Sequence, residues 1–247
     1  MPSSVRDDLI EVAHRHLAQH GATGLSLRAI ARDLGVVPSA LYRHVSGRDQ
    51  LLTLLIVDAY TDLAETVLAG ERACARDDHA GRWTAIADGM RQWAITHPHR
   101  WGLLYGTPVA GYDAPASETT PPGTAVLQLL ARLAADVAQA RAASTDDRAT
   151  ADVDRDTDQD THRPADPQLP VLDPSGGLFS QAMLEEFVPD APADHIGALE
   201  VADCLVLWSL LIGSISNEIF GQFGPDLTRP EDFHAHVVRR GAQLLGV

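Results

Sequence analysis

Residues 25–49 have the sequence LSLRAIARDLGVVPSALYRHVSGRD, and this stretch decides the fold. Four apolar residues follow the i, i+3, i+4, i+7 spacing that places side chains on one helical face, namely Leu27, Ile30, Ala31 and Leu34. Ser26 precedes them in the N-cap position, and Gly35 ends the helix. Pro38 suits the first turn of a second short helix, because its missing N–H costs nothing there. The stretch therefore predicts a helix-turn-helix.

The second helix of this motif leaves a polar and basic surface once its apolar residues are buried. Leu41 and Val45 supply the apolar side. The other positions are small, aromatic or basic: Ser39, Ala40, Tyr42, Arg43 and His44. Such side chains can approach base edges and phosphates in the major groove of DNA. At this stage the alternative is that each of them only packs or caps within the protein.

The same run resembles the DNA-binding domain of TetR-type (TetR/AcrR) bacterial transcriptional regulators over roughly residues 5–65. The shared residues agree in order and spacing: Gly35-Val36, Leu41-Tyr42, His44, Arg48 and Leu51-Leu52. The resemblance implies a homodimeric repressor that binds double-stranded, palindromic operator DNA and responds to a small-molecule effector. The residues expected to contact DNA are Arg28, Val37, Pro38, Ser39, Ala40, Tyr42, Arg43, His44 and Arg48.

Residues 101–115 are similar to a signature in the C-terminal domain of one subgroup of TetR-type regulators. The shared positions are Trp101, Leu103, Gly106, Pro108, Gly111, Tyr112, Ala114 and Pro115. Residues 208–224 resemble the penultimate helix of the same subgroup. The density of Gly and Pro after Tyr105 predicts irregular backbone. The signature supports the family and indicates no particular ligand.

The formal charge of −15 is unusual for a protein that binds DNA, so its distribution matters. Residues 1–50 contain six Arg and five acidic residues, whereas the rest of the chain contains 13 Arg and 29 acidic residues. The acidity therefore lies outside the helix-turn-helix. At physiological salt, repulsion from the acidic part is largely screened beyond about 8 Å.

Helical periodicity extends along the rest of the chain and predicts an all-α fold. Beyond the motif, the expected helices cover residues 5–20, 46–68, 81–97, 124–143, 178–188, 193–223 and 229–245. The first should bury Val5, Leu9, Val12, Ala13, His16 and Leu17, and the Ser46-Gly-Arg-Asp49 pattern should cap the next helix after the motif. Residues 142–173 are rich in Asp and poor in large apolar residues, which predicts a disordered acidic loop. We expect a DNA-binding domain over 1–50 and a regulatory and dimerisation domain over 51–247.

The two last long helices, 193–223 and 229–245, carry more apolar surface than one buried face needs. The resemblance implies that they form the dimer interface. Most aromatic and Met residues also lie outside the helix-turn-helix, and we expect an effector site at Trp93, Trp101, Tyr105, Met183 and Trp208. Filling of the core is the alternative for any one of them. The competing class of protein is a small-molecule-binding or enzymatic helical bundle in which the motif only packs.

Catalytic and metal-binding patterns are not found in the sequence. Cys74 and Cys204 have no CxxC spacing, and the paired histidines lack further ligands at tetrahedral spacing. Neither a phosphate-binding loop nor a nucleophile elbow is found. The longest apolar run, near residues 204–212, is interrupted by Ser209. We therefore expect a cytoplasmic protein that is not an enzyme and has no metal, cofactor or membrane span.

Overall fold

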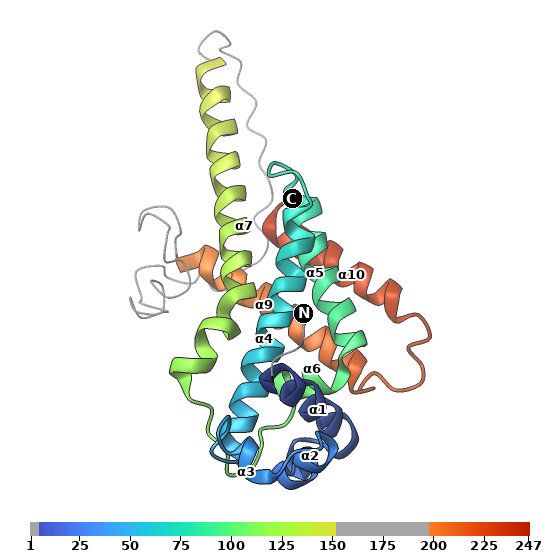
Figure 1. Ribbon diagram of the computed structural model, residues 1–247. Coiled ribbons are helices and arrows are strands. Elements are labelled where there is room, and N and C mark those ends of the chain that lie inside the picture. The colour runs from blue at the N-terminus through green and yellow to red at the C-terminus, as the bar shows by residue number, and fades with distance from the viewer. Residues whose placement is uncertain (1–4, 152–197) are drawn as a thin grey trace.

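In the computed structural model, which describes residues 5–151 and 198–247, every regular element is helical. α1 (Val5–His20), the 3-10 turn η1 (Ala22–Gly24), α2 (Leu27–Asp33) and α3 (Pro38–Leu41) form a head at one end (Figure 1). α4 (Arg48–Arg72) leaves the head and enters the body. The body contains α5 (His79–Thr96), α6 (Pro98–Tyr105), α7 (Ala116–Ala151), α9 (Ala198–Ile219) and α10 (Pro230–Leu245). The predicted all-α fold is confirmed.

The turns of the head follow from local chemistry. The Ser26 hydroxyl accepts a hydrogen bond from the Ala29 N–H at 3.4 Å, so Ser26 is the N-cap of α2 as predicted. Gly35 has a φ of +68°, which favours glycine at the turn before α3. The start of α4 differs from the expectation, because its N-cap is Gly47, with no side-chain cap. The Gln50 side chain instead reaches back and accepts from the Ser46 N–H at 2.5 Å, so the predicted cap by the Ser46 side chain is wrong.

The helix α4 contributes residues to two hydrophobic cores, one in the head and one in the body. The head core includes Leu9, Ile30, Leu41, Leu51, Leu52 and Leu55, and the body core begins at Ala59. Because one continuous helix contributes to both cores, a shift of α4 in the body must also move the head. Val5 lies outside the head core, 53% exposed, so its predicted burial is wrong. It is the first residue of α1, and the buried residues of this helix begin at Leu9.

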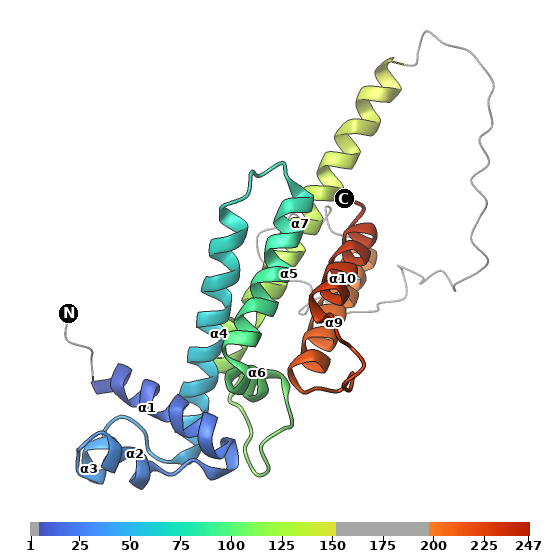
Figure 2. The same ribbon diagram turned by 90° about the vertical axis from the view of Figure 1, so that its right-hand side faces the viewer.

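In the body, α4, α5 and α7 lie side by side, and α9 pairs with α10 (Figure 2). Trp83 on α5 joins these two groups, because its indole N–H donates to the Val238 carbonyl of α10 at 2.7 Å. A Cβ atom on Gly241 would lie 2.1 Å from the Trp83 ring. The close approach of α10 to α5 therefore requires a glycine at this position.

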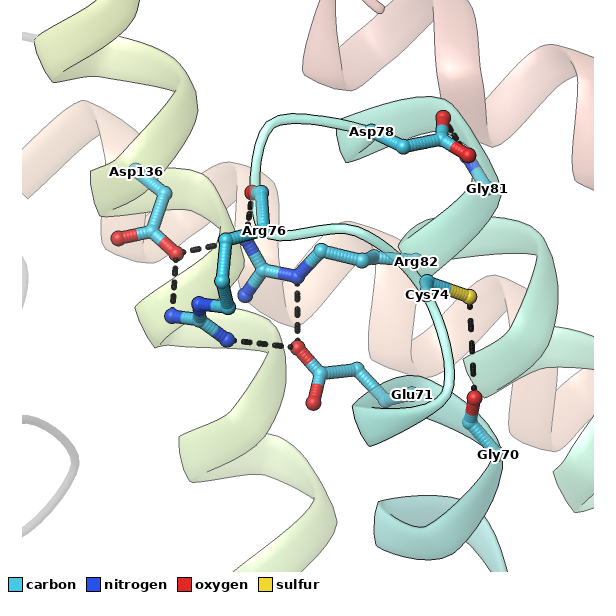
Figure 3. Close-up of polar contacts among 8 residues, drawn as sticks. All are labelled: Gly70, Glu71, Cys74, Arg76, Asp78, Gly81, Arg82 and Asp136. Carbon is cyan, nitrogen blue, oxygen red and sulfur yellow. Dashed lines mark hydrogen bonds and ion pairs between the residues drawn. The ribbon is translucent and has the colours of Figure 1, made fainter.

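A buried ion-pair network holds the end of α4 that is remote from the head (Figure 3). The Arg82 Nε donates to Glu71 Oε1 at 2.6 Å, and its Nη1 donates to Asp136 Oδ2 at 2.7 Å and to the Arg76 carbonyl at 3.1 Å. Arg76 reaches both carboxylates from the α4–α5 loop. Burial disfavours the charged form of Arg82, but the hydrogen bonds to Asp136 and Glu71 outweigh it and raise the pKa of Arg82. The network joins α4, α5 and α7.

The helix boundaries differ from prediction at several places: α4 continues to Arg72 rather than to 68, α6 was not among the expected helices, and α7 and α9 also differ. α7 begins at Ala116 rather than at 124 and continues to Ala151, so residues 142–151 are helical and not part of a disordered loop. Pro121, Pro122 and Gly123 fall near the start of the helix, and no Gly or Pro interrupts residues 124–151 that follow. α9 ends at Ile219 rather than at 223, just before Gly221 with a φ of +65°. The rest of the predicted loop (152–173), the predicted helix 178–188 and residues 193–197 lie outside the described residues.

Candidate DNA-binding interface and effector site

The outer face of α3 presents the residues that the sequence predicts for DNA contact. Leu41 and Val45 point into the head core, each with 1% exposure. The opposite side is open: Val37 is 66% exposed and Tyr42 is 52% exposed. Pro38, Ser39, Arg43 and His44 are also exposed, and Ala40 is half-buried. Val37 and Tyr42 directly precede and follow α3, so the exposed surface extends beyond the four residues of the helix.

Two of the predicted basic residues are available for phosphates. Arg28 on α2 and Arg43 after α3 are exposed, and neither has an ion-pair partner among the residues that the structure describes. Arg48 differs, because its Nη2 donates to the Ala22 carbonyl at 3.1 Å and its side chain is 34% exposed. Arg48 therefore fastens the η1 turn to the start of α4, a role that the sequence did not indicate.

Two buried histidines hold the head helices in register. His16 on α1 lies 2.7 Å from Asp33 of α2, and this hydrogen bond lowers the pKa of Asp33. His14, also on α1, lies 2.8 Å from Asp58 of α4. Burial lowers the pKa of His14, and the bond to Asp58 opposes that effect. The sequence predicted burial of His16 but gave no signal for His14, which neighbours the apolar face.

The predicted effector residues lie in the body core. Trp101 is fully buried and Trp93 is 3% exposed; their indole N–H groups donate to Ser216 at 3.1 Å and Asp62 at 3.0 Å. Tyr105 packs between Trp101 and Trp208, with ring centroids at 4.5 and 6.1 Å. Met183 lies outside the described residues. Within the described ranges, no group of three His, Cys, Asp or Glu side chains is arranged to hold a metal ion.

Two pockets lie closer to the head than these aromatic residues. One has a volume of about 460 Å³ and lies between α4, the segment after α6 and the start of α7. The other, about 480 Å³, lies between the end of α1, α6 and Phe220 after α9. Neither is lined by Trp93, Trp101, Tyr105 or Trp208. The predicted aromatic group therefore borders the pocket region without forming its wall.

Family models match both parts of the chain. Residues 9–55 match bacterial regulatory proteins of the tetR family, and residues 83–240 match the tetracyclin repressor-like C-terminal domain. The chain belongs to the TetR family. It is therefore a DNA-binding transcriptional regulator with a helix-turn-helix, and not an enzyme, as the sequence predicted. Neither match tests the individual DNA-contacting residues, which stay predictions.

Relatives of this TetR-family protein are regulators of the same kind. The HTH-type transcriptional regulator Rv1816 of Mycobacterium tuberculosis is 41% identical over 220 residues, which cover 89% of this chain and 82% of that protein. The crystal structure of regulatory protein SCO4313 has a TM-score of 0.67 at 28% identity and covers 98% of this chain and 96% of its own. A TetR family regulator from Shewanella sp. PV-4 shares the fold, with a TM-score of 0.56 at 16% identity, over 98% of this chain and 96% of its own.

α9 of this TetR-family protein is unusually apolar. The stretch Ala202–Ile219 has a mean hydropathy of 1.3, so by length and composition alone it could cross a membrane. Only 28% of this stretch is buried. Val206 on α9 and Leu244 on α10 are about half exposed. The apolar excess predicted for these helices is thus present on their surface.

Sequence reasoning missed one contact between the head and the body. The segment Gly106–Pro115, which contains most of the subgroup signature, reaches the first turns of α4, and the Tyr112 hydroxyl lies 2.9 Å from the Thr53 hydroxyl. Val109 and Tyr112 also pack against the head core. The signature marked this segment as unusual, but nothing in it indicated a partner 59 residues away.

Proposed function

We propose that this TetR-family regulator is a cytoplasmic homodimeric repressor that binds a palindromic operator and is released by a small molecule. The observation that carries the proposal is the surface at α3, where small, aromatic and basic side chains are exposed while Leu41 and Val45 on the opposite side are buried in the head core. Ser39, Ala40 and Tyr42 are assigned to the groove, with Val37 and Pro38 at its edge. Phosphate contacts are assigned to Arg28, Arg43 and His44, and to the N–H groups of Arg48 that Ala22 does not use.

The dimer is assigned to α9 and α10, within the predicted ranges 193–223 and 229–245. Val206, Ser209 and Gly213 are exposed at helical spacing on α9, so an apolar and small-residue strip faces outward. Such a strip allows close packing against a second copy. A two-fold dimer would place two α3 helices about 34–36 Å apart, one turn of DNA, as a palindrome requires.

Release by an effector is assigned to the body. The predicted effector residues Trp93, Trp101, Tyr105, Met183 and Trp208 stay a prediction, and the four of them that the structure describes line neither of the two pockets. A ligand that shifts α4 would change the separation of the two heads, because α4 contributes to both cores. Such coupling is typically worth about 1–3 kcal/mol.

Fluorescence anisotropy with DNA that flanks the protein's own gene tests the operator proposal. Arg28→Ala and Arg43→Ala should each weaken binding at least fivefold, because each removes a phosphate contact. Arg72→Ala is the matched control, since Arg72 is an exposed arginine at the far end of α4. Parent-like binding by both head variants would overturn the assignment of α3 and α2 to DNA. Failure of the parent to bind any flanking fragment would favour a helical small-molecule-binding bundle.

A further inference from the structure

The segment Gly106–Pro115, here called the linking segment, packs against the head with one of its sides. Val109 and Tyr112 pack against the head core, and Leu103 at the end of α6 joins them. Thr53 has one hydroxyl proton, and its Oγ1 lies 3.1 Å from the Asp49 carbonyl, which can only accept. The Tyr112 hydroxyl must therefore donate to Thr53 at 2.9 Å. The linking segment is thus fastened to the first turns of α4 by one directed hydrogen bond.

The other side of the linking segment forms a wall of the 460 Å³ pocket. Three helices and the linking segment line it: Ile56 and Tyr60 of α4, Leu103 and Leu104 of α6, six members of the linking segment including Thr107 and Tyr112, and Thr119, Thr120, Gly123 and Thr124 of α7. None of these side chains carries a charge. The volume falls within the range of about 300–1,000 Å³ that is usual for small-molecule sites.

The polar groups of this pocket are hydroxyls that stay neutral. Burial raises the pKa of Tyr60, which lines the pocket. Tyr105 does not line the pocket but packs against Tyr60, and burial raises its pKa well above its usual value. The two rings meet edge to face at 6.0 Å. The Tyr105 hydroxyl is buried and has no hydrogen-bond partner among the described residues. A charged ligand would lose its hydration here and find no counter-charge among the side chains that line the pocket, whereas an uncharged ligand would meet several hydroxyls.

We propose that this pocket binds an uncharged small molecule and that the ligand acts on the head through Tyr112. The inference rests on the proposed effector response and adds to it the class of ligand and the route of coupling. Tyr112 lines the pocket and also bonds to Thr53, so a ligand that displaces the linking segment breaks the contact with α4. The ion pair of Glu71 with Arg82 fixes the end of α4 in the body, so loss of the Tyr112 contact lets the head end of α4 move.

Paired fluorescent probes of the same ring system test the ligand class. N-phenyl-1-naphthylamine is uncharged, and 1-anilinonaphthalene-8-sulfonate differs by one sulfonate. The neutral probe should bind saturably at one site per chain and at least tenfold more tightly than the sulfonate. Thr120→Phe, which fills the pocket, should weaken the neutral probe at least tenfold, whereas Ser117→Phe on the exposed first turn of α7 should not. Equal affinity for the two probes, or unchanged binding by Thr120→Phe, overturns the site.

Hydrogen exchange of residues 48–55 tests the route without DNA. The neutral probe should accelerate exchange there at least threefold in the parent, and Tyr112→Phe, which keeps the ring, should abolish the change. Thr53→Val removes the other hydroxyl and should behave in the same way. If the probe binds but both variants respond like the parent, the route through Tyr112 is wrong. If the parent binds operator DNA but the probe does not change exchange of residues 48–55, this inference is refuted and the proposed function is not. If the probe changes exchange but the parent binds no operator, this inference is supported and the proposed function is refuted.

Discussion

Removal of one partner from the buried network around Arg82 should destabilise the body strongly, while removal of both partners should not. Arg82 is fully buried and Glu71 is 2% exposed, and their side chains are joined at 2.6 Å. Glu71→Leu would leave the Arg82 charge with Asp136 as its one carboxylate partner among the described residues. Arg82→Met would leave Glu71 with Arg76, whose side chain is 71% exposed.

The magnitude follows from burial. Breaking a buried ion pair by removing one partner costs about 3–5 kcal/mol, because a charge stays buried without compensation. Asp136 still lies 2.7 Å from Arg82, which favours the lower end of that range. Glu71 also sits in the last turn of α4, where loss of a negative charge returns about 0.3–1 kcal/mol. We therefore expect a loss of about 2–3 kcal/mol for Glu71→Leu, and a similar loss for Arg82→Met.

The double variant Glu71→Leu/Arg82→Met should lie within about 1 kcal/mol of the parent, since an apolar pair can replace a buried ion pair of similar volume. Urea unfolding, followed by fluorescence of the four tryptophans, measures all four proteins at one fixed concentration. A double variant as unstable as the sum of the two singles would refute the reasoning. Single variants that unfold like the parent would refute it as well.

Three further outcomes are expected. Gly241→Ala should destabilise the protein by about 1–3 kcal/mol, because its Cβ would overlap the buried Trp83 ring, whereas Gly70→Ala, whose new Cβ meets its nearest atom at 3.8 Å, should be neutral or stabilising in the same urea assay. The folded state holds the pKa of His14 below 6.5, so the stability that depends on neutral His14 is complete above pH 6.5 and is lost as the pH falls toward the folded pKa. When the unfolding free energy is measured between pH 7.5 and 5.5, its dependence on pH should be weaker in His14→Gln than in the parent. His99→Gln, at an exposed histidine, is the control and should keep the parent's dependence. Arg43→Ala should weaken binding to all DNA sequences alike and reduce the salt slope by about one unit for each lost phosphate contact, and a change in sequence preference would contradict a phosphate role.

Local sequence patterns were enough to predict the helix-turn-helix and the all-α class. Ser26, Gly35 and Pro38 act through their own backbone and nearest neighbours, so the start and end of α2 and the start of α3 could be derived locally. The apolar periodicity of α4 through α10 likewise depends on spacing alone. The family followed from the same residues, because they agree in order and spacing.

Tertiary structure alone decided which polar groups are buried and which pocket exists. Glu71, Arg82 and Asp136 look like ordinary surface charges in the sequence. Glu71 and Arg82 can be buried only because three helices bring opposite charges together, with Asp136 half-buried beside them. Trp93 and Trp101 were predicted to line an effector site, but composition cannot distinguish a pocket wall from a core filled by indole rings with bonded N–H groups. The Tyr112–Thr53 contact joins residues 59 positions apart, and no local pattern specifies such a pair. Helix periodicity is a property of neighbouring residues, whereas desolvation and hydrogen bonding at these sites depend on the packing of whole elements.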